Sequence, residues 1–314
     1  WAIENFGYRQ PQRWLKTAYR ELVWAPVLAG RQLLRHRVDL YHSTGGPLFI
    51  PPVGIRYVAT LHDLAGARHP ERFRRWHRLT SGRRYARIQR AERVICISRF
   101  TADEAMALLG IPSSRIEVVH NGCDFSVNAE RVPEAVPSFA VPAEFFLFVG
   151  SLEPGKNLAL LKAAYELAEA RGVTLPPLFI VGARWEGVAG EGKPPQGWHY
   201  LGRQPDEVLV YLYRRALALV FPSKYEGFGL PVVEAMAFGC PVICSRVASL
   251  PEVAGKAALF ADLEPAAYLK AMREMCDVSR REEYRLQGLA RAGEFTWEAC
   301  ARGTVAVYEG VMGM

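Results

Sequence analysis

Short apolar runs alternate with longer amphipathic segments over the second half of the chain, and this alternation constrains the fold more than any other feature. Runs with the length of buried strands lie at 145–150, 178–182, 199–202, 217–221, 241–244 and 257–260. Runs that are apolar throughout are typical of parallel strands whose sheet is covered by helices on both faces. We therefore expect an α/β fold built from βαβ units, with ligands bound beyond the carboxyl ends of the strands.

The first half of the chain is less regular. Strand-like runs lie at 38–43, 56–61, 93–97 and 115–120. Residues 1–37 form aromatic and basic segments with a helical pattern, so we expect this half to lack the first strand of a doubly wound sheet. A stretch rich in Pro, Ser and Glu, from Asp124 to Ala143, is the expected hinge. The length of 314 residues fits two domains of about 150 residues each.

The composition predicts a packed globular protein. Half of the residues are hydrophobic and 23% are charged. No uncharged apolar run reaches the roughly 18 residues of a membrane-spanning helix, and no secretory signal is recognised. The six cysteines show no CxxC spacing, and several lie in apolar runs as small buried hydrophobes. A cytoplasmic location is therefore expected.

The segment Phe221–Ser245 carries the clearest functional pattern. A strand-like run leads into a loop, and a helix follows from about Gly229, with Pro231 in its first turn. The N–H groups that such a helix start leaves free, together with its dipole, favour an anion such as phosphate; here they belong to Phe228, Gly229 and Leu230. Glu226 and Glu234 flank this site, and the arrangement suits a ligand with phosphates and sugar hydroxyls.

Several separate motifs resemble the retaining glycosyltransferases of family 4. EGFGLPVVEAMAFGCPVICS is followed by SLPEVAG and FTWE, and is preceded by LHDL, VICISRFTADE, VVHNGCD and VGSLEPGKN in the same order as in that family. The resemblance covers the chain from about Tyr41 to its C-terminus. Several motifs in register are far more specific than a lone glycine pattern.

The resemblance implies a GT-B fold, in which two Rossmann-like domains face each other across a cleft. It implies an acceptor-binding domain at 1–135, a nucleotide-sugar-binding domain at 136–296 and a helix at 297–314 that crosses back to the first domain. The implied reaction transfers a sugar from a nucleotide-sugar donor to an acceptor, with retained anomeric configuration and no metal ion or other cofactor.

The resemblance assigns a role to each acid of the pair. Glu226 contacts the hydroxyls of the donor sugar, and Glu234 accepts hydrogen bonds from the ribose, as an acid does in dinucleotide-binding folds. Two other readings of the pair are solvated surface acids and the carboxylate pair of a glycosidase. The helix start and a nearby lysine favour donor binding.

Lys156 follows a strand and a turn, so its ammonium group can meet the diphosphate and offset the charge of the leaving nucleotide. Many members of the resembled family carry an arginine where Ser151 stands. Ser151 is kept as a donor-site residue, and Arg184 and Arg203 are candidates for a second cation. A lone surface lysine is the alternative for Lys156.

His62, in LHDL, corresponds to a histidine that lies near the reacting sugar in the resembled family; a histidine packed at a strand end is the alternative. Glu252, with Gly227 and Gly229, is expected to shape the donor pocket or to form a structural turn. Ser98 or Thr101 is expected to cap a helix.

The formal net charge of +7 is concentrated in the segment Arg68–Arg99, which has eleven arginines and two acids, Glu71 and Glu92. Phe73, Trp76 and Tyr85 are interleaved. The segment is either a solvated helix face or a surface that binds anionic lipid headgroups at the inner face of the membrane. No nucleic-acid motif accompanies the arginines.

The sequence thus predicts a glycosyltransferase that moves a hexose, mannose or rhamnose in preference, from a GDP-, UDP- or dTDP-linked donor. The expected acceptor is a glycan or a lipid-linked molecule of surface polysaccharide synthesis. A non-catalytic or weakly active protein that binds nucleotide sugars and a sugar-nucleotide epimerase remain the alternatives.

Overall fold

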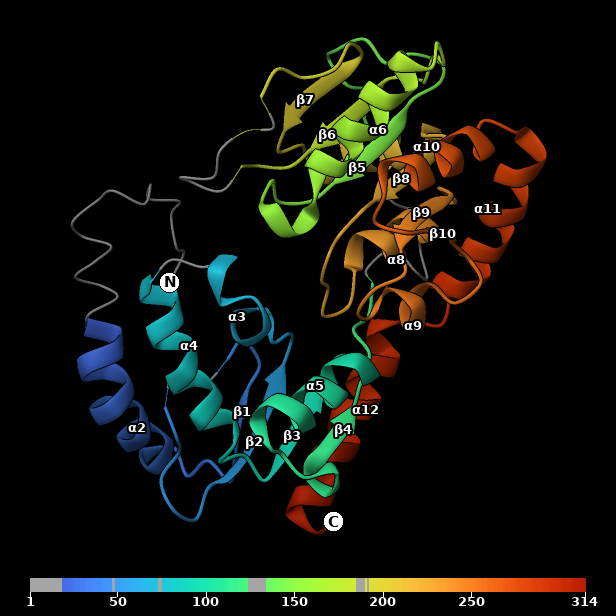
Figure 1. Ribbon diagram of the computed structural model, residues 1–314. Helices are drawn as coiled ribbons and strands as arrows, with labels where there is room; N and C mark the ends of the chain where they lie inside the picture. The colour runs from blue at the N-terminus through green and yellow to red at the C-terminus, as the bar shows by residue number, and fades with distance from the viewer. Residues whose placement is uncertain (1–18, 47–48, 73–74, 124–133, 185–189, 191) are drawn as a thin grey trace. The chain divides into compact units, whose positions relative to one another are not determined.

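The computed structural model describes residues 19–46, 49–72, 75–123, 134–184, 190 and 192–314. The chain forms two compact units (Figure 1). The first contains residues 1–96, 102–118 and 304–314, and the second contains residues 97–101 and 119–303. The domain boundaries expected at 135 and 296 stay predictions. Within the described residues, no helix is both long and apolar enough to span a membrane.

The first unit is built on a four-stranded parallel sheet with the order β1-β2-β3-β4 (Figure 1). Its strands are Leu40–Ser43, Arg56–Leu61, Arg93–Cys96 and Ile116–Val118. Its helical elements are η1 (Arg20–Ala29, with π-type hydrogen bonding), α2 (Gly30–Arg35), α3 (Ala65–Arg68), η2 (Pro70–Arg72), α4 (Arg75–Ile88), α5 (Arg99–Leu109) and η3 (Ser113–Arg115). Tyr57, Ala59 and Leu61 of β2 pack into its core with Ile88 and Ile111.

The second unit is built on a six-stranded sheet with the order β10-β9-β8-β5-β6-β7, in which every pairing is parallel. Its strands are β5 (Phe146–Val149), β6 (Leu178–Val181), β7 (Trp198–Gly202), β8 (Ala218–Phe221), β9 (Val242–Ser245) and β10 (Leu259–Ala261). The chain builds the sheet outward from β5 in one direction and then returns to place β8 on the other side of it. This is the strand order of a Rossmann sheet, and the reversal between β5 and β8 is its topological switch point.

Both faces of this sheet are buried, because neighbouring residues of each strand point to opposite faces. In β5, Phe146 and Phe148 pack with α6 (Leu158–Ala170) and α10 (Pro265–Glu274). Leu147 and Val149 point the other way, toward α7 (Asp206–Arg215), α8 (Leu230–Ala237) and α9 (Leu250–Ala254). The fully apolar runs of the sequence are therefore strands with a core on each side.

Two long helices complete the chain. α11 (Val278–Ala292) packs on α8, and the side chain of Asp277 caps it by accepting a hydrogen bond from the Arg280 N–H, 3.0 Å away. α12 (Trp297–Met312) belongs to the second unit as far as Gly303 and to the first unit from Thr304. In the first unit, Tyr308 of α12 lies 2.6 Å from Nδ1 of His42 on β1.

The structure confirms every predicted strand, with shifts at some ends. The strand expected from Ala257 begins at Leu259, because the Ala257 N–H still bonds to the Ala254 carbonyl in a turn. The strand expected from Arg115 begins at Ile116, because Arg115 closes a turn with Pro112. Part of the expected hinge, 124–133, lies outside the described residues.

Candidate active site

Lys156 and Glu226 meet at the switch point of the second sheet. Lys156 follows β5, and Glu226 follows β8, its neighbour in the sheet. Lys156 Nζ lies 2.5 Å from Glu226 Oε1, and the two side chains are only 18% and 11% exposed. The switch point is where open α/β sheets bind their ligands. The structure thus brings together two of the residues that the sequence predicted to bind the donor.

The loop after β5 is shaped to hold Lys156. The short helix η5 (Pro154–Lys156) is capped by Glu153, whose carboxylate accepts a hydrogen bond of 2.7 Å from the Gly155 N–H. Asn157 then takes a left-handed conformation, with φ of 58°. The Gly155 carbonyl accepts a 2.8 Å hydrogen bond from the Lys224 N–H, which ties this loop to the one that carries Glu226.

Buried hydroxyl groups anchor the loop that carries Glu226. Ser245 Oγ donates to the Ser223 carbonyl at 2.5 Å, and Ser249 Oγ donates to the Glu226 carbonyl at 2.9 Å. Ser98 Oγ donates to the Gly227 carbonyl at 2.7 Å. These hydrogen bonds fix the backbone of the loop through its carbonyl groups.

Gly229 starts the helix that follows. Its φ is 98°, and a Cβ at this position would lie 2.7 Å from Leu250 Cδ2, so both the conformation and the packing require glycine. α8 begins at Leu230, with Pro231 in its first turn. Among the described residues, the N–H groups of Phe228 and Gly229 make no hydrogen bond. The helix start therefore keeps the free donors that an anion needs.

Glu234 lies one turn into α8. Tyr213 of α7, which is fully buried, donates its hydroxyl to Glu234 Oε2 at 3.2 Å. Burial of the phenol and the neighbouring Glu234 charge raise the pKa of Tyr213 well above its usual value, so the hydroxyl stays a donor. The sequence singled out Glu234 but not Tyr213.

The other predicted donor-site residues lie at different places along the sheet. Ser151 is in the loop between β5 and η5, and Arg184 pairs beside it in a short bridge with Leu152. Ser151 thus belongs to a loop of the switch point, whereas Arg184 follows β6 and is brought beside that loop by the bridge. Arg203 is exposed and follows β7, the edge strand two positions away from β5.

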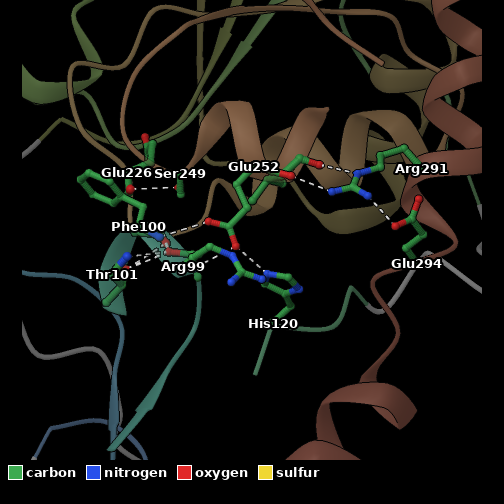
Figure 2. Close-up of polar contacts among 12 residues, drawn as sticks. Arg99, Phe100, Thr101, His120, Glu226, Ser249, Glu252, Arg291 and Glu294 are labelled. Atoms are coloured by element: carbon green, nitrogen blue, oxygen red, sulfur yellow. Dashed lines mark hydrogen bonds and ion pairs between the residues drawn. The ribbon is translucent and has the colours of Figure 1, made fainter. Parts of the chain in front are cut away.

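Glu252 is surrounded by protein donors (Figure 2). Its carboxylate accepts from the N–H groups of Arg99 and Phe100, at 2.8 and 3.1 Å, and lies 2.7 Å from His120 Nε2. Both carboxylate oxygens of Glu252 are therefore engaged by other residues of the second unit. His120 was not predicted as a site residue, although it lies inside the VVHNGCD motif.

Opposing effects set the pKa of Glu252. Burial raises it, whereas the hydrogen bonds from His120, Arg99 and Phe100 and the charge of His120 lower it, and the lowering prevails. Ser98 caps α5 as predicted, since its Oγ accepts from the Thr101 N–H at 3.1 Å.

In the first unit, His62 follows β2 with its side chain exposed, and its Nε2 lies 2.6 Å from the Thr44 carbonyl. His42, which the sequence did not single out, lies between Tyr308 and Thr60, with Nδ1 and Nε2 at 2.6 and 2.8 Å from their hydroxyls. Burial, and to a lesser extent the nearby His62, lower the pKa of His42.

The basic segment includes α4. Arg83, Arg84 and Arg90 are exposed, whereas Arg68 pairs with Glu104 at 2.5 Å. Phe73 and the side chain of Trp76 lie outside the described part of the chain.

Comparison with known proteins identifies the family. Residues 4–127 match the family Glycosyltransferase Family 4, and residues 135–285 match Glycosyl transferases group 1. O-antigen chain mannosyltransferase B of Escherichia coli is 35% identical, over 97% of this chain and 82% of that protein. The chain belongs to glycosyltransferase family 4. This family 4 chain is an enzyme, a glycosyltransferase.

Other comparisons agree. The MMP alpha-(1->4)-mannosyltransferase of Mycolicibacterium hassiacum is 30% identical, over 96% of this chain and 76% of that protein. Sucrose-phosphate synthase of Thermosynechococcus elongatus matches the structure with a TM-score of 0.71 at 18% identity, over 99% of this chain and 82% of that one. Anabaena HepE, in complex with UDP and glucose, matches with a TM-score of 0.65 at 18% identity, over 92% and 82%. With its two parallel-sheet units, the family 4 enzyme has the GT-B fold.

The pKa of Glu252 makes a prediction about acid stability. Because its folded pKa is lowered, the carboxylate stabilises the fold above the ordinary pKa of about 4.3, and this contribution is lost as pH falls through the lowered folded value. We expect Glu252→Gln to reduce the free energy of unfolding by about 1–2 kcal/mol at pH 7. The difference should shrink below about pH 4.

Chemical denaturation of both proteins between pH 7 and pH 3.5 measures this difference. Glu117→Gln, at an exposed position of β4, is the control and should change little at any pH. A difference that stays constant with pH would show that the charge of Glu252 does not contribute.

Proposed function

We propose that this enzyme transfers mannose, with retention, from a nucleotide-sugar donor to a glycan or lipid-linked acceptor of surface polysaccharide synthesis. The observation that carries the proposal is the partly buried Lys156–Glu226 pair at the switch point, beside a helix start with free N–H groups. The names of the two relatives, both mannosyltransferases, support the sugar. HepE, solved with UDP and glucose, supports a nucleotide-sugar donor.

Each part of the site has a proposed role toward the donor. The start of α8 binds the diphosphate through the N–H groups of Phe228, Gly229 and Leu230, and Glu234 accepts hydrogen bonds from the ribose. Tyr213 occupies one oxygen of Glu234 and so orients the carboxylate. Glu226 accepts hydrogen bonds from the sugar hydroxyls.

Lys156 is the proposed cation for the leaving group. It pairs with Glu226, and since the two side chains are only 18% and 11% exposed, this charge–charge interaction is stronger than it would be in bulk water. A bound diphosphate offers the ammonium group a second anion, and Lys156 then stabilises the charge that builds on the departing phosphate. Ser151 and Arg184, on neighbouring loops, are the proposed second contacts, with Arg203 as a more distant candidate. We propose that this cation makes a metal ion unnecessary.

Retention is proposed to proceed on one face of the sugar. The bond from the anomeric carbon to the diphosphate breaks while the acceptor oxygen bonds to the same face, and the departing phosphate oxygen takes the acceptor proton. His62 is proposed to orient the reacting sugar; its ring hydrogen bond with Thr44 fixes the imidazole.

The basic segment is proposed to attach the enzyme to anionic lipid. Exposed Arg83, Arg84 and Arg90 belong to a stretch with few acids, and one of these acids, Glu92, already pairs with Arg56 at 2.9 Å. A peripheral position on the inner face of the membrane would bring the enzyme to a lipid-linked acceptor.

A thermal-shift panel tests the donor. We expect GDP-mannose to raise the melting temperature more than dTDP-rhamnose or UDP-glucose does, because mannose is the proposed sugar. A ligand at a hundred times its dissociation constant stabilises the folded protein by about 2.7 kcal/mol, which a melting curve detects. Equal shifts for all three, or a larger shift with dTDP-rhamnose or UDP-glucose, would contradict mannosyl transfer from GDP-mannose.

Two substitutions test the site. Lys156→Met and Glu226→Gln should each lower the turnover number by about a hundredfold or more, since each removes a group that acts on the charge or the sugar of the transition state. Transfer is measured with the nucleotide sugar that gives the largest thermal shift. Added EDTA should leave the turnover number of the native enzyme unchanged.

Lys162→Met is the matched control. Lys162 lies on α6 and pairs with Glu166 at 3.2 Å, in the same unit as Lys156. Its loss should leave turnover unchanged. Full turnover in Lys156→Met, or its abolition by EDTA in the native enzyme, would refute the proposed role of the lysine.

Sedimentation with vesicles tests the basic segment. We expect binding to vesicles that contain phosphatidylglycerol, but not to pure phosphatidylcholine, and a decline as salt rises. Arg83→Gln with Arg84→Gln should weaken binding about thirtyfold, since each basic side chain near an anionic surface contributes about 1 kcal/mol. Arg302→Gln, an exposed residue of α12, is the control. Binding that does not depend on salt concentration or on lipid charge would refute the proposed attachment of the basic segment to anionic lipid.

A further inference from the structure

A set of hydrogen bonds supports the loop that carries Glu226 (Figure 2). The set joins the start of α5, the segment around His120 and the short helix α9, all within the second unit. Glu252 of α9 is its centre.

Glu252 holds the first residues of α5. Its two carboxylate oxygens accept from the N–H groups of Arg99 and Phe100, so a negative charge faces the positive end of that helix. Ser98 caps the same turn through the Thr101 N–H. The start of α5 is thereby fixed from two sides.

The start of α5 in turn holds both neighbours of Glu226. The hydroxyls of Ser98 and Thr101, which are completely buried, lie 2.7 and 3.3 Å from the Gly227 carbonyl. The ring of Phe100 meets the ring of Tyr225 edge-on, with 5.5 Å between their centroids. The residues before and after Glu226 therefore both contact the segment that Glu252 holds.

His120 links Glu252 to the next residue of the loop. Its Nε2 lies 2.7 Å from Glu252 Oε1, and its ring packs at 6.0 Å from the ring of Phe228. Phe295 closes this aromatic cluster, with centroids at 5.6 Å from His120 and 5.4 Å from Phe228.

α9 itself is fixed from behind. Arg291 donates to the carbonyls of Glu252 and Val253 at 2.6 and 2.9 Å. The same helix begins after Ser249, whose hydroxyl donates to the Glu226 carbonyl (Figure 2). A displacement of α9 would therefore change the position of Glu226 in two ways. One is the hydrogen bond from Ser249, and the other is the contact of Glu252 with the start of α5.

We propose that Glu252 and His120 are positioning residues for Glu226, holding its loop in the orientation that transfer requires. The inference rests on the proposed role of Glu226 at the donor sugar. Neither residue touches the donor; their hydrogen bond fixes the start of α5 and the ring of Phe228, and these fix the backbone on both sides of Glu226. Loss of the bond affects the chemical step more than the binding of the nucleotide.

Three variants separate hydrogen bonding from packing. Glu252→Gln removes the charge, His120→Phe keeps a ring without a donor, and His120→Gln keeps an N–H donor without the ring. We expect Glu252→Gln and His120→Phe to lower the turnover number by about tenfold to a hundredfold. His120→Gln should retain most of the turnover. The dissociation constant of GDP should stay within about twofold of the native value in all three variants, because these residues orient Glu226 and do not bind the nucleotide.

Asp277→Ala is the matched control. Asp277 caps α11 in the same unit through a hydrogen bond from Arg280 of that helix, so its loss also removes a carboxylate from a helix start. It should lower the melting temperature and leave turnover intact. Transfer is measured with the nucleotide sugar that stabilises the native enzyme most among GDP-mannose, dTDP-rhamnose and UDP-glucose.

Amide hydrogen exchange gives a readout that does not depend on turnover. Peptides covering 222–233 should exchange faster in Glu252→Gln and His120→Phe than in the native enzyme, and at the native rate in Asp277→Ala. Unchanged exchange of these peptides in Glu252→Gln and His120→Phe would overturn the proposal. A loss of turnover that is fully explained by a smaller fraction of folded enzyme would also overturn it.

The outcomes also separate this inference from the proposed function. If Glu226→Gln retains activity, the role of Glu226 fails, whatever the supporting variants do. If Glu226→Gln is inactive while Glu252→Gln and His120→Phe turn over normally, the function stands and the positioning role is refuted.

Discussion

The pairing of β5 with β8 is the constraint on which the site depends. These strands are 72 residues apart where Phe146 is in register with Ala218, and the chain has built β6 and β7 on the far side before it returns. Only this reversal brings the loop of Lys156 next to the loop of Glu226. The helices that cover each face bury alternate residues of β5, so the position of the two loops is set by the core of the second unit.

Around this point the structure uses backbone carbonyls for support. Hydroxyls of Ser245, Ser249 and Ser98 bind carbonyls of the loop between Ser223 and Gly227. The donors at the start of α8 have no described acceptor. A loop that is satisfied on one side and open on the other can receive an anion without first breaking its own hydrogen bonds.

Much of this architecture could be predicted, because it depends on patterns of residues that are close together in the sequence. Fully apolar runs marked the strands, and the strand-then-turn position of Lys156 and Glu226 placed both at one edge. His120 and Glu252 are 132 residues apart, and no spacing rule joins them. Tyr213 is one aromatic residue on an amphipathic helix, and nothing local distinguishes a buried phenol that bonds a carboxylate from one that only packs. His120 did carry one signal, its place within a recognised motif.

The interleaving of the two units along the chain has a consequence for dissecting this enzyme. The chain passes from one unit to the other between residues 96 and 97, 101 and 102, 118 and 119, and 303 and 304. A fragment that ends at residue 118 would keep the sheet of the first unit but lose Tyr308, the partner of His42. The remaining fragment would lose Ser98 and, with it, the hydroxyl on the Gly227 carbonyl. A cut at this point therefore takes from each unit a hydrogen bond whose second partner lies on the other fragment.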